Sequence, residues 1–325
     1  MNKMPSFRNH PNKDILREKW CKPIIQTIYN TLNYKFLYLG LPGINALDIS
    51  TWIDYIEEVI AFEYSDEENE DEFNKLNEYL NKLERERKIN AYRLYCGWME
   101  EIIISGQDDN NIPFIQNDVV TIYNLDFCNT ISSPIKIYDD KTQTIQKYYK
   151  FESIRRLLEI QRSILDCKKQ KKFVMFLTVH EGLLETEIKN LQQHLDQNLL
   201  DTYLKNINGL NNTEKGIRLL KLYIYSILNK HFSSCSFSPE FLPTIFYEGT
   251  GGHKLLLFTI LGTYEQNPSG FAKCYQDIQE CIMHKFLSPK KGIIDILNLA
   301  EIKEINIPTD PCLLIKDSYT LKELW

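Results

Sequence analysis

Apolar side chains recur along the first half of the chain with two spacings, one typical of helices and one typical of buried strands. A broad apolar face that includes Ile15, Trp20 and Ile24 predicts a helix over 13–32, with a bend near Pro23 because proline lacks a backbone N–H. The elements expected after it are a strand at 35–41, a helix at 46–58, a strand at 58–64, a helix at about 70–88, strands at 90–96 and 119–124, a helix at about 150–167 and a strand at 172–179. Strands alternating with helices favour an open, mostly parallel sheet that is covered by helices.

The second half of the chain adds two helical patterns and then two apolar runs around a glycine-rich segment. Helices are expected at about 184–206 and 213–231. Strands expected at 242–247 and 254–264 flank the segment from Glu248 to His253, an arrangement that predicts a hairpin. The divisions that follow are an N-terminal helical segment (1–30), an α/β domain (31–265) and a small C-terminal helical extension (266–325).

The first expected strand ends in a tight turn, Gly40-Leu41-Pro42-Gly43, which leads into the next helix. Such a turn brings bare backbone close to a ligand, and the unpaired amides at a helix start favour negative charge or polar acceptors. Glu63 lies near the end of the second strand, where open α/β sheets commonly bind a ribose diol. The two features together predict a nucleotide-cofactor site. An ordinary strand-to-helix turn and a solvated strand-end acid are the alternative explanation.

Five strand-and-helix units followed by a terminal hairpin resemble the class I methyltransferase fold, in which an antiparallel seventh strand lies beside the sixth. The resemblance covers about residues 30–265 and implies a Rossmann-like α/β fold, with a mostly parallel seven-stranded sheet and a terminal antiparallel hairpin. Within that fold, the Gly-x-Pro-Gly turn after an N-terminal helix looks closest to the three-Cys-motif partner proteins. The cofactor that this resemblance implies is S-adenosylmethionine.

The resemblance also implies roles for individual residues. Gly40, Pro42 and Gly43 would line the methionine part of S-adenosylmethionine, and Glu63 would accept hydrogen bonds from the ribose hydroxyls. Trp98, after the third strand, would pack on the purine face, with core packing as the equal alternative.

Polar residues follow the fourth strand, whose end faces the transferred methyl group in this fold. Asp126 and Asn129 are the candidates for orienting or deprotonating an acceptor nitrogen or hydroxyl. A carboxylate that caps the next loop is the alternative for Asp126. Cys128 has no thiolate-stabilising base nearby in sequence, so a buried inert thiol is favoured there. His180 and Glu181 follow the fifth strand at the same edge and are further candidates for substrate contact.

Charge and composition narrow the classes of partner. The 38 Lys and Arg against 44 Asp and Glu give a formal charge of −6, which argues against a generally basic nucleic-acid-coating surface but permits a local patch. The eight cysteines include no CxxC pair, so reduced thiols are expected. The polar N-terminus and the shortness of every apolar run predict a cytoplasmic protein without a membrane partner. Dispersed histidines and the absence of a phosphate-loop motif predict neither a metal site nor ATP binding.

Three functions stay open at this level. The leading hypothesis is a divergent S-adenosylmethionine-dependent methyltransferase of unknown acceptor, with a weak preference for a nucleic-acid base. The alternative is a catalytically inactive methyltransferase-like subunit that binds a protein partner or a nucleotide-derived ligand. The observation that supports this alternative is the lack of two acids. Tyr38 or Leu39 stands where the first strand of the fold often carries an acid, and the third strand also ends without one. The absence of Gly-x-Gly-x-x-Gly and the terminal hairpin disfavour an NAD-linked oxidoreductase.

Overall fold

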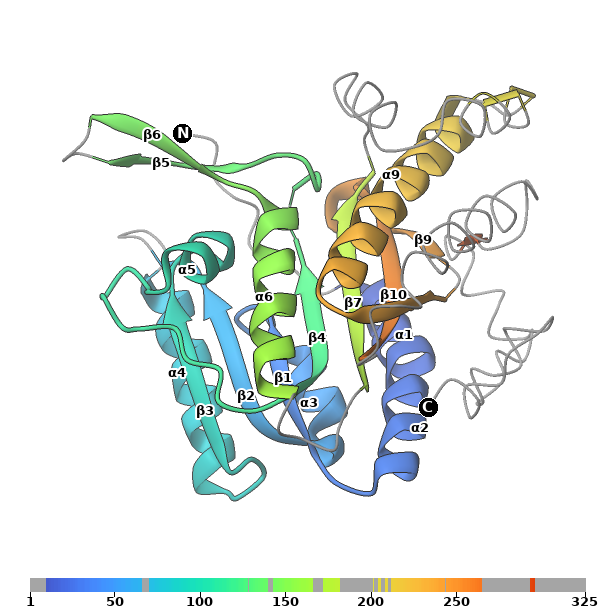
Figure 1. Ribbon diagram of the computed structural model, residues 1–325. Helices are drawn as coiled ribbons and strands as arrows, with labels where there is room; N and C mark the ends of the chain where they lie inside the picture. The colour runs from blue at the N-terminus through green and yellow to red at the C-terminus, as the bar shows by residue number, and fades with distance from the viewer. Residues whose placement is uncertain are drawn as a thin grey trace.

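The computed structural model describes most of the chain up to residue 264 (Figure 1). The described residues are 10–65, 70–127, 129–139, 143–165, 172–181, 201, 204–205, 208–209, 212–242, 244–264 and 293–295. The helix expected at 184–206 therefore falls almost wholly outside the described residues, as does most of the expected C-terminal extension.

A single twisted sheet organises the described part of the chain. Its order is β11-β9-β10-β7-β4-β1-β2-β3, with β8 paired to β10 beside β9. The strands are β1 (Phe36–Gly40), β2 (Ile56–Glu63), β3 (Ala91–Cys96), β4 (Val120–Asp126), β7 (Lys172–His180), β8 (Phe237–Phe241), β9 (Thr244–Glu248), β10 (Lys254–Tyr264) and β11 (Ile293–Asp295). The positions of β1 are all buried and those of β7 are buried except at its two ends, as expected for strands covered on both faces.

The direction of the strands confirms the expected fold class. Neighbours from β3 to β7 run parallel, whereas β10 runs antiparallel between β7 and β9. The β9–β10 hairpin is the one that the glycine-rich segment predicts. This is a Rossmann-like methyltransferase fold, with β8 and β11 enlarging the expected seven-stranded sheet to nine strands among the described residues. Because β11 lies within 266–325, a short strand is the only element described in the extension that was expected to be helical.

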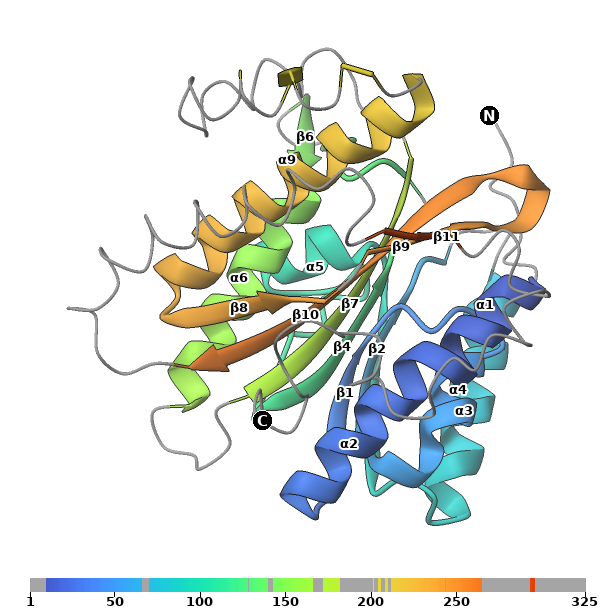
Figure 2. The same cartoon turned by 90° about the vertical axis from the view of Figure 1, so that its right-hand side faces the viewer.

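Helices cover both faces of the sheet (Figure 2). On one face lie α1 (Pro11–Leu16), the π-helical turn η1 (Arg17–Cys21), α2 (Lys22–Leu32), α3 (Leu47–Trp52), the 3-10 turn η2 (Ile53–Tyr55) and α4 (Glu70–Arg85). On the other face lie α5 (Met99–Ser105), α6 (Lys150–Leu165) and α9 (Asn212–Ser234). Each layer buries its own apolar core against the sheet. A further 3-10 turn, η3 (Thr250–Gly252), closes the β9–β10 hairpin.

A bend was expected near Pro23 in the N-terminal helix, and the irregular turn that the structure shows lies about one turn before this proline. Its π-helical turn η1 ends just before Pro23, which occupies the first turn of α2, where a missing N–H does not interrupt a hydrogen bond. The same turn buries Trp20 and Cys21. Trp20 Nε1 donates to Thr259 Oγ1 of β10 at 2.9 Å, and this hydrogen bond fixes the helix across the sheet.

Two predictions about local structure were wrong. The helix expected at 46–58 is α3, only six residues long, because the apolar run that begins at Ile56 joins the sheet as β2. No strand was expected between β4 and α6, yet β5 (Ile135–Asp139) and β6 (Thr144–Tyr148) form a separate antiparallel pair. This pair projects from the body above the carboxyl ends of the parallel strands (Figure 1). No helix among the described residues is long and apolar enough to cross a membrane.

Candidate functional site

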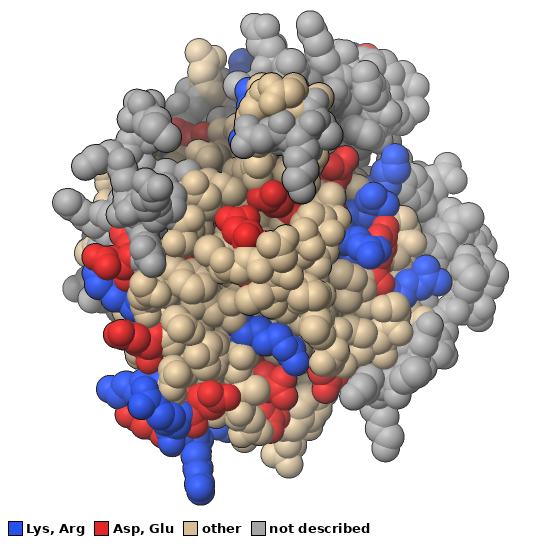
Figure 3. All heavy atoms as spheres, turned by 90° about the vertical axis from the view of Figure 1, so that its left-hand side faces the viewer, with Lys and Arg blue, Asp and Glu red and all other residues tan. Residues whose placement is uncertain are grey.

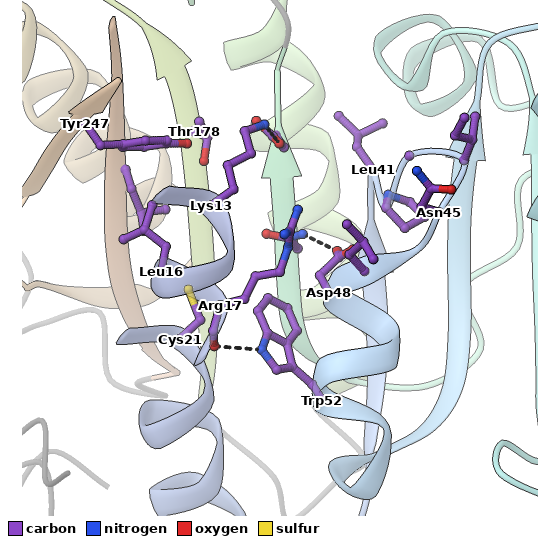
Figure 4. Close-up of a pocket in the computed structure, with 17 residues that line it drawn as sticks. Lys13, Leu16, Arg17, Cys21, Leu41, Asn45, Asp48, Trp52, Thr178 and Tyr247 are labelled. Atoms are coloured by element: carbon purple, nitrogen blue, oxygen red, sulfur yellow. Dashed lines mark hydrogen bonds and ion pairs between the residues drawn. The ribbon is translucent and has the colours of Figure 1, made fainter. Parts of the chain in front are cut away.

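A cavity of about 70 Å³ lies where the strand order of the sheet reverses. From β1 the chain proceeds outward through β2 and β3, and it then returns to the other side of β1 as β4. In open α/β sheets such a switch point leaves a crevice outside the carboxyl ends of the strands, where ligands bind. The turn after β1 lines the cavity on one side, and the N-terminal helical segment lines it on the other (Figure 4).

The turn after β1 owes its glycines to packing. A Cβ at Gly40 would lie 2.3 Å from the carbonyl oxygen of Asn124, so only glycine lets β1 approach β4 this closely. Gly43 has a φ of 64°, and its carbonyl accepts a hydrogen bond from Ala46 at 3.0 Å. Pro42 and Gly43 line the cavity, whereas Gly40 is the last residue of β1 and lies outside the lining. Because α3 has six residues, its N-terminus offers little of the helix dipole that was expected there.

A buried carboxylate occupies the floor of the cavity. Asp48, in the first turn of α3, accepts hydrogen bonds from Tyr38 Oη and from Asn124 Nδ2, each at 2.5 Å. Burial raises the pKa of the Asp48 carboxyl, and both hydrogen bonds act in the opposite direction. Tyr38 or Leu39 was expected to stand where the fold often carries an acid, and Asp48 reaches Tyr38 from the following helix.

The N-terminal helical segment contributes two cations to the cavity. Lys13 Nζ lies 2.5 Å from Asp126 Oδ2, and both side chains are mostly buried. Arg17 extends into the space between Lys13 and Asp48 (Figure 4) and also donates to Asp14 Oδ1 at 2.9 Å. Its backbone carbonyl accepts a hydrogen bond from Trp52 Nε1 at 3.2 Å. The cavity therefore combines two cations from the N-terminal helical segment with the carboxylates of Asp126 in β4 and Asp48 in α3, a set that sequence spacing does not reveal.

Glu63 lies at the end of β2, as expected, but outside the lining of this cavity. Burial, together with the charge of Glu72, raises the pKa of Glu63 to about 7, and a hydrogen bond to the Tyr64 backbone acts against this rise. No cation contributes to the shift. A desolvated carboxylate whose charge is not neutralised lowers the stability of the fold. Hydroxyl groups of a ligand would stabilise the ionised carboxylate by donating hydrogen bonds to it.

Trp98 follows β3, and its ring stacks on Tyr64, with ring centroids 4.5 Å apart and planes inclined by 28°. Beside it, Gly97 has a φ of 124° and contacts the carboxylate of Asp109, where a Cβ would lie 2.7 Å from Oδ1. Asp109 also donates its backbone N–H to the Cys96 carbonyl at 3.0 Å. The sequence has no acid directly after β3, but the carboxylate of Asp109, twelve residues further on, lies beside Gly97.

Carboxylates gather at this β3 edge of the molecule, where Figure 3 shows acidic groups surrounded by uncharged surface. Burial and the neighbouring charge of Asp109 raise the pKa of Glu101 to about 7. The β2–β3 end of the site therefore carries excess negative charge, unlike the balanced cavity at β1 and β4. Among the described residues no group of three or more His, Cys, Asp or Glu is placed to hold a metal ion.

The remaining predicted residues divide between the cavity edge and the surface. Asp126 lines the cavity, whereas Asn129 is exposed outside it, and Cys128 lies outside the described residues. His180 ends β7, and its ring lies 5.2 Å from that of His253 in the β9–β10 hairpin. Burial and His253 lower the pKa of His180, although Asp126 opposes the change, and the lowered pKa favours the neutral imidazole.

Comparisons with known proteins leave the family open. No family model and no curated protein matches the chain. Solved structures that resemble it include the YcgJ protein of Bacillus subtilis, with 10% identity over 75% of this chain and 99% of that chain and a TM-score of 0.37. Magnesium protoporphyrin IX methyltransferase of Synechocystis with bound SAH has 10% identity, coverages of 81% and 90% and a TM-score of 0.34. TYW2 of Pyrococcus horikoshii in complex with MeSAdo has 12% identity, coverages of 79% and 65% and a TM-score of 0.37. Since these scores are low, the fold assignment depends on strand order and direction.

Proposed function

We propose that the chain is an S-adenosylmethionine-dependent methyltransferase. The observation that supports this best is the cavity at the switch point, whose two cations and two carboxylates complement a zwitterionic amino acid. The amino-acid end of S-adenosylmethionine carries one carboxylate and one ammonium group. Lys13 and Arg17 are the cations for the carboxylate, and Asp48 with Asn124 are the oxygen acceptors for the ammonium.

The rest of the cofactor follows the sheet edge towards β3. Pro42 and Gly43 would lie along its methionine chain, and Gly40 allows the turn to pass so close to β4. Glu63 would accept hydrogen bonds from the ribose hydroxyls, which explains a desolvated carboxylate at that strand end. Trp98 would pack on the adenine, with the nearby carboxylate of Asp109 as an acceptor for its exocyclic amine.

When bound, S-adenosylmethionine supplies an electrophilic methyl group on a sulfonium that leaves readily. The protein therefore has to align the acceptor and exclude water. Asp126 ends β4 and Asn129 follows it, and both would orient the acceptor. His180 lies at the neighbouring strand end, and because burial lowers its pKa it is a candidate to take the acceptor's proton. The likeness to three-Cys-motif partner proteins belongs to the same proposal and is supported by the helix that precedes β1.

Calorimetry of the full chain with S-adenosylhomocysteine tests the proposal. Arg17→Gln removes the cation that lies between Lys13 and Asp48, and Lys19→Gln is the matched control because Lys19 is exposed in the same helical turn. A hydrogen bond to a charged group contributes about 1.5–3 kcal/mol, so Arg17→Gln is expected to weaken binding by about tenfold or more. Equal affinity in the two variants would contradict the placement of the amino-acid end.

A second candidate function is a catalytically inactive subunit with the same fold. It is favoured by two contacts that compete with the cofactor, because Lys13 already pairs with Asp126 and Tyr64 already stacks on Trp98. Both pairs would have to separate or make room on binding. The absence of any heat of binding at millimolar S-adenosylmethionine and S-adenosylhomocysteine would favour this second function over the enzyme.

A further inference from the structure

The hairpin of β5 and β6 stands alone as a two-stranded sheet. Side chains along β5 alternate, so that Ile135 and Ile137 are partly buried whereas Lys136 and Tyr138 are exposed. The partly buried side faces the body, where β6 contacts α5. An isolated two-stranded pair is marginally stable in water, so every cross-strand pair influences whether it forms.

The exposed face of this hairpin breaks a rule of strand pairing. Lys136 lies directly opposite Lys147, and like charges in that position are destabilising. Both lysines are exposed, and neither forms an ion pair with any residue that the structure describes. On the same face Tyr138 lies opposite Ile145, with 53% and 59% of their surfaces exposed. Such violations of local preference concentrate at functional sites.

Two adjacent cations beside an exposed aromatic ring suit one class of partner. Single-stranded nucleic acid offers phosphates to lysines and base faces to a ring, and proteins that bind it combine these two features. The Tyr138 hydroxyl donates to Gln143 Oε1 at 2.6 Å, which restrains the ring on the exposed face. The chain as a whole carries a charge of −6, so this doublet is a local feature.

The loop that joins the hairpin to β4 is held in place by contacts with Lys150. The loop between Asp126 and β5 is fixed by Lys150, which is 2% exposed, donates to the Ser133 carbonyl at 2.7 Å and lies 5.5 Å from the centre of the Phe127 ring. The hairpin is therefore anchored near the carboxyl end of β4, from which it extends over α5 (Figure 1).

We infer that the exposed face of the β5–β6 hairpin, formed by Lys136, Tyr138, Ile145 and Lys147, binds single-stranded nucleic acid. Binding by this face does not require methyl transfer. If the proposed function also holds, the inference narrows the acceptor to a base in such a strand.

Fluorescence anisotropy with a labelled single-stranded oligonucleotide, without cofactor, tests the inference on the full chain. Lys136→Gln with Lys147→Gln removes two phosphate contacts, and Lys35→Gln with Lys75→Gln is the control of equal charge at exposed lysines outside the hairpin. For a single strand the slope of log affinity against log salt is expected to fall by about 1.4, so the affinity ratio grows about 25-fold between 1 M and 0.1 M salt. Because the double substitution relieves a like-charge pair, thermal melting is expected to be unchanged or higher, so a loss of binding cannot be attributed to unfolding.

The aromatic contribution is tested separately. Tyr138→Ala is expected to weaken binding at least about fivefold, whereas Tyr138→Phe, which keeps the ring, retains it. Equal salt slopes in the two lysine variants would overturn the inference, and so would tighter binding of poly-glutamate than of the oligonucleotide. Failure of cofactor binding in calorimetry would leave the nucleic-acid result intact, so the two proposals fail independently.

Discussion

The affinity for an adenosyl ligand is expected to depend on the ionisation of Glu63. In the free protein, burial and the charge of Glu72 raise the pKa of Glu63 to about 7, whereas ribose hydroxyls donate to the ionised form. The ionised fraction then rises from about 9% at pH 6 to about 91% at pH 8, so the affinity is expected to increase about tenfold over that range.

The ligand for this measurement is 5′-methylthioadenosine, which keeps the ribose and adenine but has no amino-acid group that titrates near pH 7. Calorimetric Kd values at pH 6, 7 and 8 are compared for the native chain, Glu63→Gln and Glu58→Gln. Glu58 lies on the same strand, away from its carboxyl end, and serves as the control. Glu63→Gln is expected to bind more weakly at pH 8 and to show no slope. A slope of equal size in Glu63→Gln would refute the assignment of the ribose site.

The same carboxyl group makes a prediction for stability. Because the pKa of Glu63 in the folded protein lies above that of the unfolded chain, the folded state binds more protons between about pH 4.5 and pH 7. The stabilisation is complete below that range and is lost as the pH rises through it, by no more than about 3 kcal/mol. Urea unfolding at pH 8 is expected to show Glu63→Gln more stable than the native chain, and a less stable variant would contradict the sign.

Two further substitutions test how the site is supported. Gly40→Ala places a Cβ 2.3 Å from the Asn124 carbonyl oxygen and is expected to lower the free energy of unfolding by about 1–3 kcal/mol. Gly216→Ala in α9, where a Cβ meets open space, is the control and is expected to be neutral or stabilising. Equal urea midpoints for the two variants would contradict the packing role of Gly40. The Glu100 carboxylate is 3% exposed and lies 3.7 Å from Lys150 Nζ. Lys150→Met removes this cation and is expected to lower the free energy of unfolding by about 3–5 kcal/mol, and adding Glu100→Gln is expected to restore much of that loss. A double variant that melts no higher than Lys150→Met would argue against a buried ion pair.

The sequence predicted the elements whose apolar pattern is strong. Continuous apolar runs such as Phe173 to Val179 predict a strand that is covered on both faces, and the glycine-rich segment between two such runs predicts the β9–β10 hairpin. The β5–β6 pair was missed because it buries little, although Lys136 and Tyr138 of β5 alternate with Ile135 and Ile137 as residues in strands do. β8 was missed because it contains Pro239, which normally argues against a central strand.

The candidate site was predictable only in its local parts. Glu63 ends one recognisable strand and the turn at Pro42 and Gly43 follows another, so their places at the sheet edge could be inferred from order alone. Lys13 and Asp48 reach the cavity through tertiary packing, and neither stands in a motif. The Lys13–Asp126 pair joins residues 113 positions apart, which no local pattern encodes.

The hydrogen bond from Trp20 to Thr259 spans 239 positions of sequence and bears on how the chain is made. During synthesis from the N-terminus, the first amphipathic helix emerges long before β10, against which Trp20 packs. The apolar face of this helix includes Ile24 and Ile28. The part of it that packs against β10 therefore stays uncovered until nearly the whole domain has been synthesised. Among the described residues, β10 is thus the last long strand to leave the ribosome, and it covers the first helix, which makes closure of the nascent protein a late, long-range event.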